Sequence, residues 1–192
     1  MLQEGIDIAV IGNALRALRG NPHTELHLAA GTERLLHRFA DEHDQLRDTI
    51  ALLRTAANRV VAGPDAAALA SLTAAHTLLT ERILPHEQAE EAQLYPALAR
   101  PLGSGEATAT MSRTHAEIQR LSDRIATHLA LAQSAGAIQH DQLDDLLACL
   151  YGLYALLRLH FVQEEESYFT LAEDDSATGL PPRPAGAQPR KS

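Results

Sequence analysis

Two stretches of the sequence place a glutamate four residues after a histidine. His86 and Glu90 lie in "PHEQAEE", and His160 and Glu164 lie in "HFVQEEE". On an α-helix, residues four apart differ in direction by only about 40°, so each pair projects from one face of its helix. Burying such groups without partners would cost several kcal/mol. Imidazole nitrogens and carboxylate oxygens together are typical transition-metal ligands, so each pair is a candidate part of a metal site.

The rest of the chain predicts the helices that would position these pairs. Four segments have apolar residues at three- and four-residue steps, and almost no segment shows strand alternation. Thr32 is the expected cap of the first helix, and breaks at Gly63-Pro64, "RPLGSG" and "SAGA" separate the helices. The segments cover about 32–61, 65–99, 105–134 and 139–172. Long helices joined by short turns pack as antiparallel neighbours, so we predict an all-α, up-down-up-down four-helix bundle.

The two ends of the chain differ from the bundle in composition. Residues 1–30 are predicted to be an amphipathic N-terminal segment with a short helix, and residues 31–174 form the predicted bundle domain. Residues 175–192 are rich in proline and cannot bury a core, which predicts a disordered tail.

Composition excludes several classes of protein. The net charge of −9, from 16 Lys and Arg against 25 Asp and Glu, argues against binding to nucleic acid, which requires a basic surface. The single cysteine, Cys149, cannot form an internal disulfide, which indicates the reducing cytoplasm. No apolar run approaches the roughly 18 residues of a membrane span, and the N-terminus does not read as a signal peptide. We therefore expect a soluble cytoplasmic protein.

Helix geometry predicts that the candidate ligands meet in one layer. In an antiparallel hairpin, residues equidistant from the turn lie at the same height. For candidate ligands on successive helices, the midpoint in sequence falls at one of the three predicted turns, so the candidates should lie at one height. Each candidate also occupies a position in the apolar stripe of its helix, so it should point inward. They are His43, His86, Glu90, His115, His160 and Glu164. Four imidazoles and two carboxylates suit iron, zinc or manganese better than calcium or magnesium, and a carboxylate from each of two helices is what bridging two metals requires.

The ordered set of motifs resembles the hemerythrin-like (HHE cation-binding) family. "DEHDQL" matches the first-helix histidine of that family, "PHEQAEEAQLYP" the second-helix motif, "RTHAEI" the third-helix histidine and "LHFVQEEESYF" the fourth-helix motif. The resemblance covers residues 31 to about 172 and implies a non-haem centre of two iron ions with an oxo or hydroxo bridge. In such a centre Glu90 and Glu164 would bridge the metals, and the four histidines would be terminal ligands.

One position departs from the oxygen-carrying hemerythrins. Those proteins have a further histidine four residues after the third-helix histidine, where this chain has Gln119. Some family members use the glutamate that follows the second-helix histidine, so we predict Glu87 as a seventh ligand. Gln119 is then expected to be a hydrogen-bond donor close to the site. Glu91 and Glu165 are expected on a solvated face, and Tyr95 is expected to pack in the core or at its rim.

The resemblance leaves three functions open. The first is a di-iron module that binds or senses O2, nitric oxide, peroxide or iron itself. The second is an enzyme that decomposes peroxide or reduces nitric oxide at the same centre. The third is a regulatory domain linked to a metal transporter, because residues 2–19 resemble the C-terminal end of heavy-metal P-type ATPases.

Overall fold

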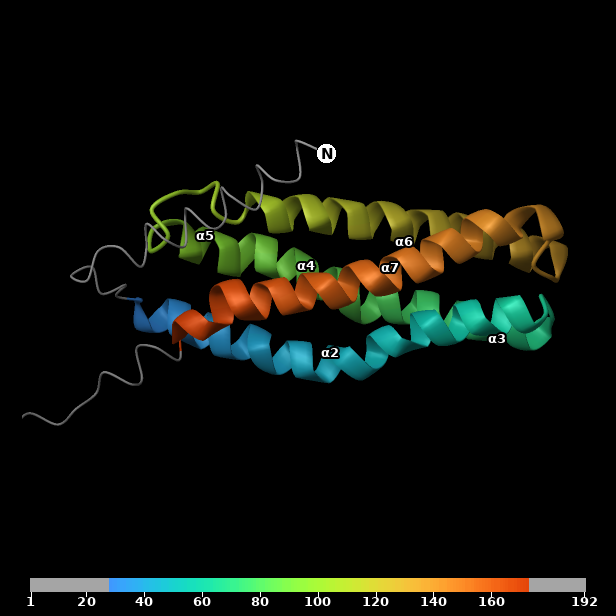
Figure 1. Ribbon diagram of the computed structural model, residues 1–192, viewed down its shortest axis with the longest axis horizontal. Helices are drawn as coiled ribbons and strands as arrows, with labels where there is room; N and C mark the ends of the chain where they lie inside the picture. The colour runs from blue at the N-terminus through green and yellow to red at the C-terminus, as the bar shows by residue number, and fades with distance from the viewer. Residues whose placement is uncertain (1–27, 173–192) are drawn as a thin grey trace, which may run out of the picture.

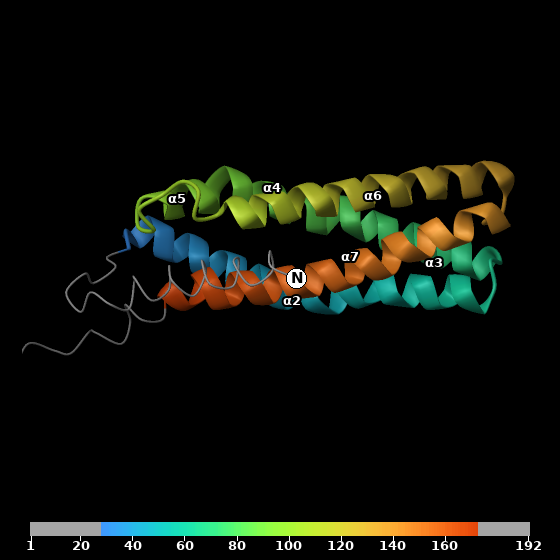
Figure 2. The same ribbon diagram turned by 45° about the horizontal axis from the view of Figure 1, so that its top comes forward.

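A computed structural model describes residues 28–172, and all regular structure in that range is helical. Four long rods run side by side and alternate in direction, joined by short turns (Figures 1 and 2). The predicted all-α antiparallel four-helix bundle is confirmed. The predicted N-terminal helix, the transporter resemblance at residues 2–19 and the predicted tail lie outside the described residues, so these three stay predictions.

The second and fourth rods are each built from several consecutive helical elements. The first rod is α2 (Ala30–Ala62) and the third is α6 (Ala109–Ala135). The second rod contains α3 (Ala66–Leu78), η1 (Leu79–Ile83), α4 (Leu84–Ala89), η2 (Glu90–Leu94) and α5 (Tyr95–Ala99). The fourth contains η3 (His140–Gln142), α7 (Leu143–Glu164) and η4 (Glu165–Phe169).

Four rod ends show how the helices begin and end. The Asp65 carboxylate accepts a hydrogen bond of 2.9 Å from the Ala68 N–H, so it caps α3. The predicted Thr32 cap is wrong, because α2 begins two residues earlier and buries Thr32. The third rod begins at Ala109, later than expected, after a turn in which Gly103 adopts a φ of 73°. Gly136, at φ 75°, ends the same rod in the left-handed conformation.

Two turns of the second rod are widened to π geometry, each directly before a proline. The Leu84 N–H donates to the Leu79 carbonyl ahead of Pro85, and the Tyr95 N–H donates to the Glu90 carbonyl ahead of Pro96. A proline lacks an N–H, and its ring clashes with the carbonyl four residues back, so a wider turn relieves the clash without breaking the rod. Each widened turn adds one residue and therefore changes which later residues face the core.

The apolar core consists of two clusters. The larger one contains Leu46, Ile83, Ile118 and Leu157, and the smaller one contains Phe39, Leu94, Met111 and Tyr168. On the first three rods, the buried residues that lie between the two clusters are polar, and on the fourth rod the buried polar residues His160 and Glu164 flank the apolar Phe161. The bundle therefore has a buried polar layer with an apolar cluster on each side, and the metal ligands were predicted in this layer.

The fourth rod is the most apolar. His140–Ala172 is long and apolar enough to cross a membrane by length and composition, with a mean hydropathy of 1.4 over 18 residues, contrary to the prediction that no such run exists. A core helix of a soluble bundle has the same composition, and this rod supplies Leu146, Leu150, Leu153 and Leu157 to the larger apolar cluster. The core accounts for part of this apolar character, since 39% of the window is buried, and one such helix does not establish a membrane span.

The assigned core face of α7 can be tested with two leucines. Leu153 is fully buried, whereas Leu159 is 55% exposed. Leu153→Ala should lower the free energy of unfolding by about 2–5 kcal/mol because it leaves a cavity. The control Leu159→Ala should change it by no more than about 0.5 kcal/mol. Urea unfolding followed by circular dichroism measures both, and equal losses would contradict the assignment.

Candidate metal centre

All seven predicted ligand side chains lie in the buried polar layer. None is more than 7% exposed, and they come from all four rods. They are His43 on α2, His86 and Glu87 on α4, Glu90 at the start of η2, His115 on α6, and His160 and Glu164 on α7. These side chains lie together in one layer, as the sequence predicted, and their role as metal ligands stays a prediction.

The first group of ligand atoms joins α2 to the second rod. His43, His86 and Glu90 each offer one atom, and these atoms lie within 4.8 Å of one another. Glu90 Oε1 lies 3.6 Å from His43 Nε2 and 3.4 Å from His86 Nε2. Two imidazoles and a carboxylate at this separation can converge on one metal ion.

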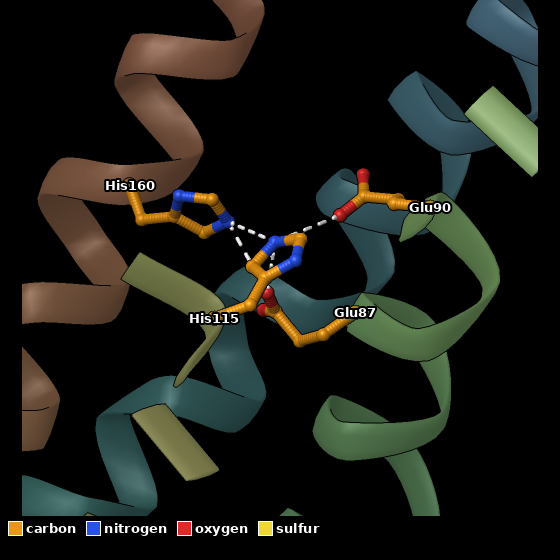
Figure 3. Close-up of side chains that lie close together, drawn as sticks. All are labelled: Glu87, Glu90, His115 and His160. Atoms are coloured by element: carbon orange, nitrogen blue, oxygen red, sulfur yellow. Dashed lines mark hydrogen bonds and ion pairs between the residues drawn. The ribbon is translucent and has the colours of Figure 1, made fainter. Parts of the chain in front are cut away.

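The second group joins the second rod to α6 and α7. Glu87, Glu90, His115 and His160 converge as Figure 3 shows, again with ligand atoms within 4.8 Å of one another. Glu87 Oε2 lies 2.5 Å from His115 Nε2 and 3.2 Å from His160 Nε2. Glu90 Oε2 lies 3.5 Å from His115 Nε2, so the two oxygens of Glu90 face the two different groups.

Glu164 also connects the two groups. Its Oε2 lies 3.3 Å from His43 Nε2, which belongs to the first group, and 3.3 Å from His160 Nε2, which belongs to the second. Glu90 is a member of both groups, and Glu164, which belongs to neither, contacts one histidine of each, so both carboxylates are shared in this sense. Their bridging of two metals, which the family resemblance implies, stays a prediction.

The layer contains polar atoms that other side chains do not satisfy. Among the described residues, eight buried side-chain nitrogen and oxygen atoms have no hydrogen-bond partner, and every one belongs to a predicted ligand. They include Nε2 of His43 and His86, both oxygens of Glu87 and Glu90, and Oε2 of Glu164. Most of these atoms face an opposite charge in a His–Glu ion pair but make no regular hydrogen bond. Imidazole nitrogens and carboxylate oxygens left in this way fit bound metal.

Comparison with known proteins identifies the family. Residues 34–172 match the family model described as hemerythrin HHE cation binding domain. The chain belongs to the hemerythrin HHE family. This membership and the two His/Glu groups together make it a metal-binding protein. Comparisons with curated proteins and with solved structures found no match.

Three histidines of this hemerythrin domain have a second carboxylate on their outer side. These carboxylates are partly exposed, and each accepts a hydrogen bond from a ring Nδ1–H. His86 pairs with Glu42 at 2.9 Å, His115 with Glu91 at 2.9 Å and His43 with Glu165 at 3.3 Å. A donor bond from Nδ1 fixes the ring and directs Nε2 into the centre, as is common for metal-bound histidines.

The role of these outer carboxylates was not predicted from the sequence. Glu91 and Glu165 were expected on a solvated face, and their side chains are partly exposed, at 41% and 27%, but the expectation did not include their hydrogen bonds to the ring nitrogens of His115 and His43. A signal was available: each outer carboxylate is a direct neighbour in sequence of a predicted ligand, in the pairs Glu42–His43, Glu90–Glu91 and Glu164–Glu165. Neighbours on a helix point about 100° apart, so one faces the centre while the next can reach an adjacent rod at the surface.

Tyr95 and Gln119 make contacts that differ from those predicted. Tyr95 was expected only to pack, but its hydroxyl donates to Glu164 Oε1 and lies 3.1 Å from His115 Nε2. The Gln119 amide was expected to donate towards the centre, but it donates to Asp123 Oδ1 at 2.8 Å, one turn further along α6. Tyr95 thus provides the hydrogen bond to a ligand carboxylate that was predicted for Gln119.

The widened turn explains why the hydrogen bond from Tyr95 to Glu164 was not predicted from the sequence. Tyr95 follows Glu90 by five residues, which on a regular α-helix would put it about 140° away from the ligand face. The π turn Glu90–Leu94 bonds the Tyr95 N–H to the Glu90 carbonyl and so stacks the two residues on one face. Phe169 follows Glu164 by the same five residues across the π turn Glu165–Phe169. Its ring packs edge-on against the His43 ring, with ring centroids 4.9 Å apart.

The carboxylates and imidazoles shift one another's pKa values when no metal ion is bound. Burial lowers the pKa of His43, but its contacts with Glu164 and Glu90 outweigh burial and raise that pKa to about 9. Burial is likewise outweighed at His115, where Glu87 and Glu90 raise the pKa to about 10. Burial raises the pKa of Glu90, but contacts with histidines, His115 first, hold it well below its usual range. The pKa of Glu87 is lowered in the same way.

These shifts predict how the stability of the metal-free protein depends on pH. The stability contributed by His43 and His115 is complete below their usual pKa of 6.5 and is lost as the pH rises through about 9 and about 10. The stability contributed by Glu87 and Glu90 is complete above their usual pKa of 4.5 and is lost in more acidic solution. Urea unfolding should therefore give the highest free energy between pH 4.5 and 6.5.

The metal-loaded protein is the control for this series. Bound metal requires deprotonated imidazoles, so the alkaline loss should be smaller once metal is present. A free energy of unfolding that rises from pH 6.5 to pH 10 in the metal-free protein would contradict the assigned charge pairs.

Glu87→Ala and Gln119→Ala test which residue is the seventh ligand. Both side chains line a surface groove of about 430 Å³ between the second rod and α6, but only Glu87 contacts the histidines. We expect Glu87→Ala to weaken metal binding at least about tenfold and Gln119→Ala to leave metal content unchanged. Elemental analysis after gel filtration measures both. The reverse outcome would move the seventh ligand to α6.

Proposed function

We propose that this protein is a non-haem di-iron protein that binds or senses O2 or another small ligand, such as nitric oxide or peroxide, or iron itself. The observation that supports the proposal best is that Glu90 belongs to both buried ligand groups and that Glu164 Oε2 lies 3.3 Å from a histidine of each. Sharing both carboxylates favours a metal pair over two independent ions. Each group also contains two histidines and at least one carboxylate, which is the ligand set typical of non-haem iron(II).

Charge supports a pair of divalent ions. Glu87, Glu90 and Glu164 together offset three of the four positive charges of two divalent cations, and a bridging hydroxo group would offset the fourth. The His115 group has Glu87 in addition to the shared carboxylates, whereas the His43 group has no carboxylate of its own. The two metal positions are therefore expected to differ, with fewer protein ligands at the His43 and His86 position.

The surrounding residues would control access to the centre. The two apolar clusters exclude water along the bundle axis on both sides of the ligand layer. Small molecules can approach from the side, through the groove beside Glu87 and His115 and through a second groove of about 290 Å³ beside His86. Bound iron would supply reversible ligand binding or redox chemistry. Cys149 is buried and unpaired, and we retain the cytoplasm as the proposed location.

The proposal predicts about two irons per chain after anaerobic reconstitution with iron(II) and removal of unbound metal. His160→Ala, which removes a buried ligand from one group, should lower the iron content while the bundle stays helical. Elemental analysis with protein quantification measures the ratio, and circular dichroism checks the fold. A ratio near one, or preferential retention of zinc from a mixture with ample iron, would contradict the proposal.

The same reconstituted protein separates binding from catalysis. A binding or sensing protein should take up O2 or nitric oxide reversibly in the reduced state, with peroxide consumption no faster than free iron gives. Sustained peroxide consumption that disappears with the metal would instead favour an enzyme that decomposes peroxide.

A further inference from the structure

Tyr95 makes the surroundings of the two Glu164 oxygens different. The hydroxyl of this tyrosine donates to Oε1, while Oε2 has no hydrogen-bond partner among the described residues and lies 3.3 Å from both His43 Nε2 and His160 Nε2. One oxygen is thus held by the protein, and the other faces the space between the two ligand groups.

Tyr95 is itself held firmly in place. It is 4% exposed, and its ring stacks on that of His115 with centroids 5.4 Å apart and an interplanar angle of 14°. Its backbone N–H is bonded to the Glu90 carbonyl in the widened turn, so its position is tied to the other shared carboxylate. A donor fixed by stacking and by the backbone can orient the carboxylate that it binds.

We propose that Tyr95 is a positioning residue that sets how Glu164 binds metal. By holding Oε1, the hydroxyl prevents the carboxylate from turning both oxygens towards one metal ion and leaves Oε2 between the two positions. This inference rests on the proposed metal pair and adds the residue that determines the bridging mode of Glu164.

Tyr168 is a matched control for Tyr95. It is also buried, at 5% exposure, and its ring centroid lies 6.2 Å from that of Tyr95. Its hydroxyl donates to the Ala107 carbonyl at 3.1 Å, away from the ligands. Tyr95→Phe and Tyr168→Phe therefore each remove one buried hydroxyl from the same apolar cluster, but only the first removes a bond to a predicted ligand.

The first test is titration of the wild-type protein and both variants with cobalt(II) against a competing chelator. Tyr95→Phe should weaken binding of the second cobalt equivalent about 10- to 100-fold, whereas Tyr168→Phe should match the wild type. Circular dichroism confirms that both variants keep the bundle. Equal affinities in the two variants would overturn the positioning role while leaving the metal pair in place. A wild-type protein that binds fewer than two equivalents would overturn the proposed function and this inference with it.

The second test is spectroscopic and asks whether Tyr95 is a ligand itself. The oxidised iron protein should have no phenolate-to-iron charge-transfer band, and Tyr95→Phe should alter the magnetic coupling between the irons seen by Mössbauer spectroscopy. A phenolate band in the wild type that is lost in Tyr95→Phe would overturn the positioning role, because the oxygen would then bind iron directly. Unchanged coupling in Tyr95→Phe would also overturn it.

Discussion

The structure depends on one constraint, which is that seven ionisable side chains are buried in a single layer between two apolar clusters. Removing a carboxylate or an imidazolium from water costs several kcal/mol unless an opposite charge or a metal compensates. The bundle compensates these buried charges with two sets of contacts. Within the layer, carboxylates face imidazoles at 2.5–3.6 Å, and outside it Glu42, Glu91 and Glu165 hold the outer ring nitrogens. The inner atoms that still lack hydrogen-bond partners are those that a cation pair would satisfy.

Irregular helix geometry is part of how the layer is built. Pro85 and Pro96 stand on either side of the second-rod ligands, and each is preceded by a widened turn. The turn before Pro96 moves Tyr95 onto the ligand face, where a regular helix would direct it elsewhere. Widened turns within α-helices are frequent at functional sites, and here one of them supplies a hydrogen-bond donor to a shared carboxylate. Pro96 therefore influences the chemistry of the centre through the widened turn that precedes it.

Much of the centre could be predicted from sequence because it depends on regular features. Helical spacing and equal distances from the turns were enough to bring His43, His86, His115 and His160 to one height, and family resemblance added Glu87. Tyr95 could not be found in this way, because five-residue spacing reaches the same face only across a π turn. Gln119 was placed by regular spacing, but its amide has a nearer acceptor in Asp123 on its own helix. The bundle itself was predictable from periodicity and from glycine and proline breaks, whereas the start of α6 depended on the local turn at Gly103.

The central claim is that two metal ions lie in this layer and share Glu90 and Glu164. Anomalous diffraction at the iron absorption edge, from crystals of the iron-loaded protein, tests it most directly. The account predicts two anomalous peaks per chain, one within coordination distance of His43 and His86 and the other within coordination distance of His115 and His160. Both peaks should contact Glu90 and Glu164. A single peak, or two peaks that do not share these carboxylates, would contradict the account.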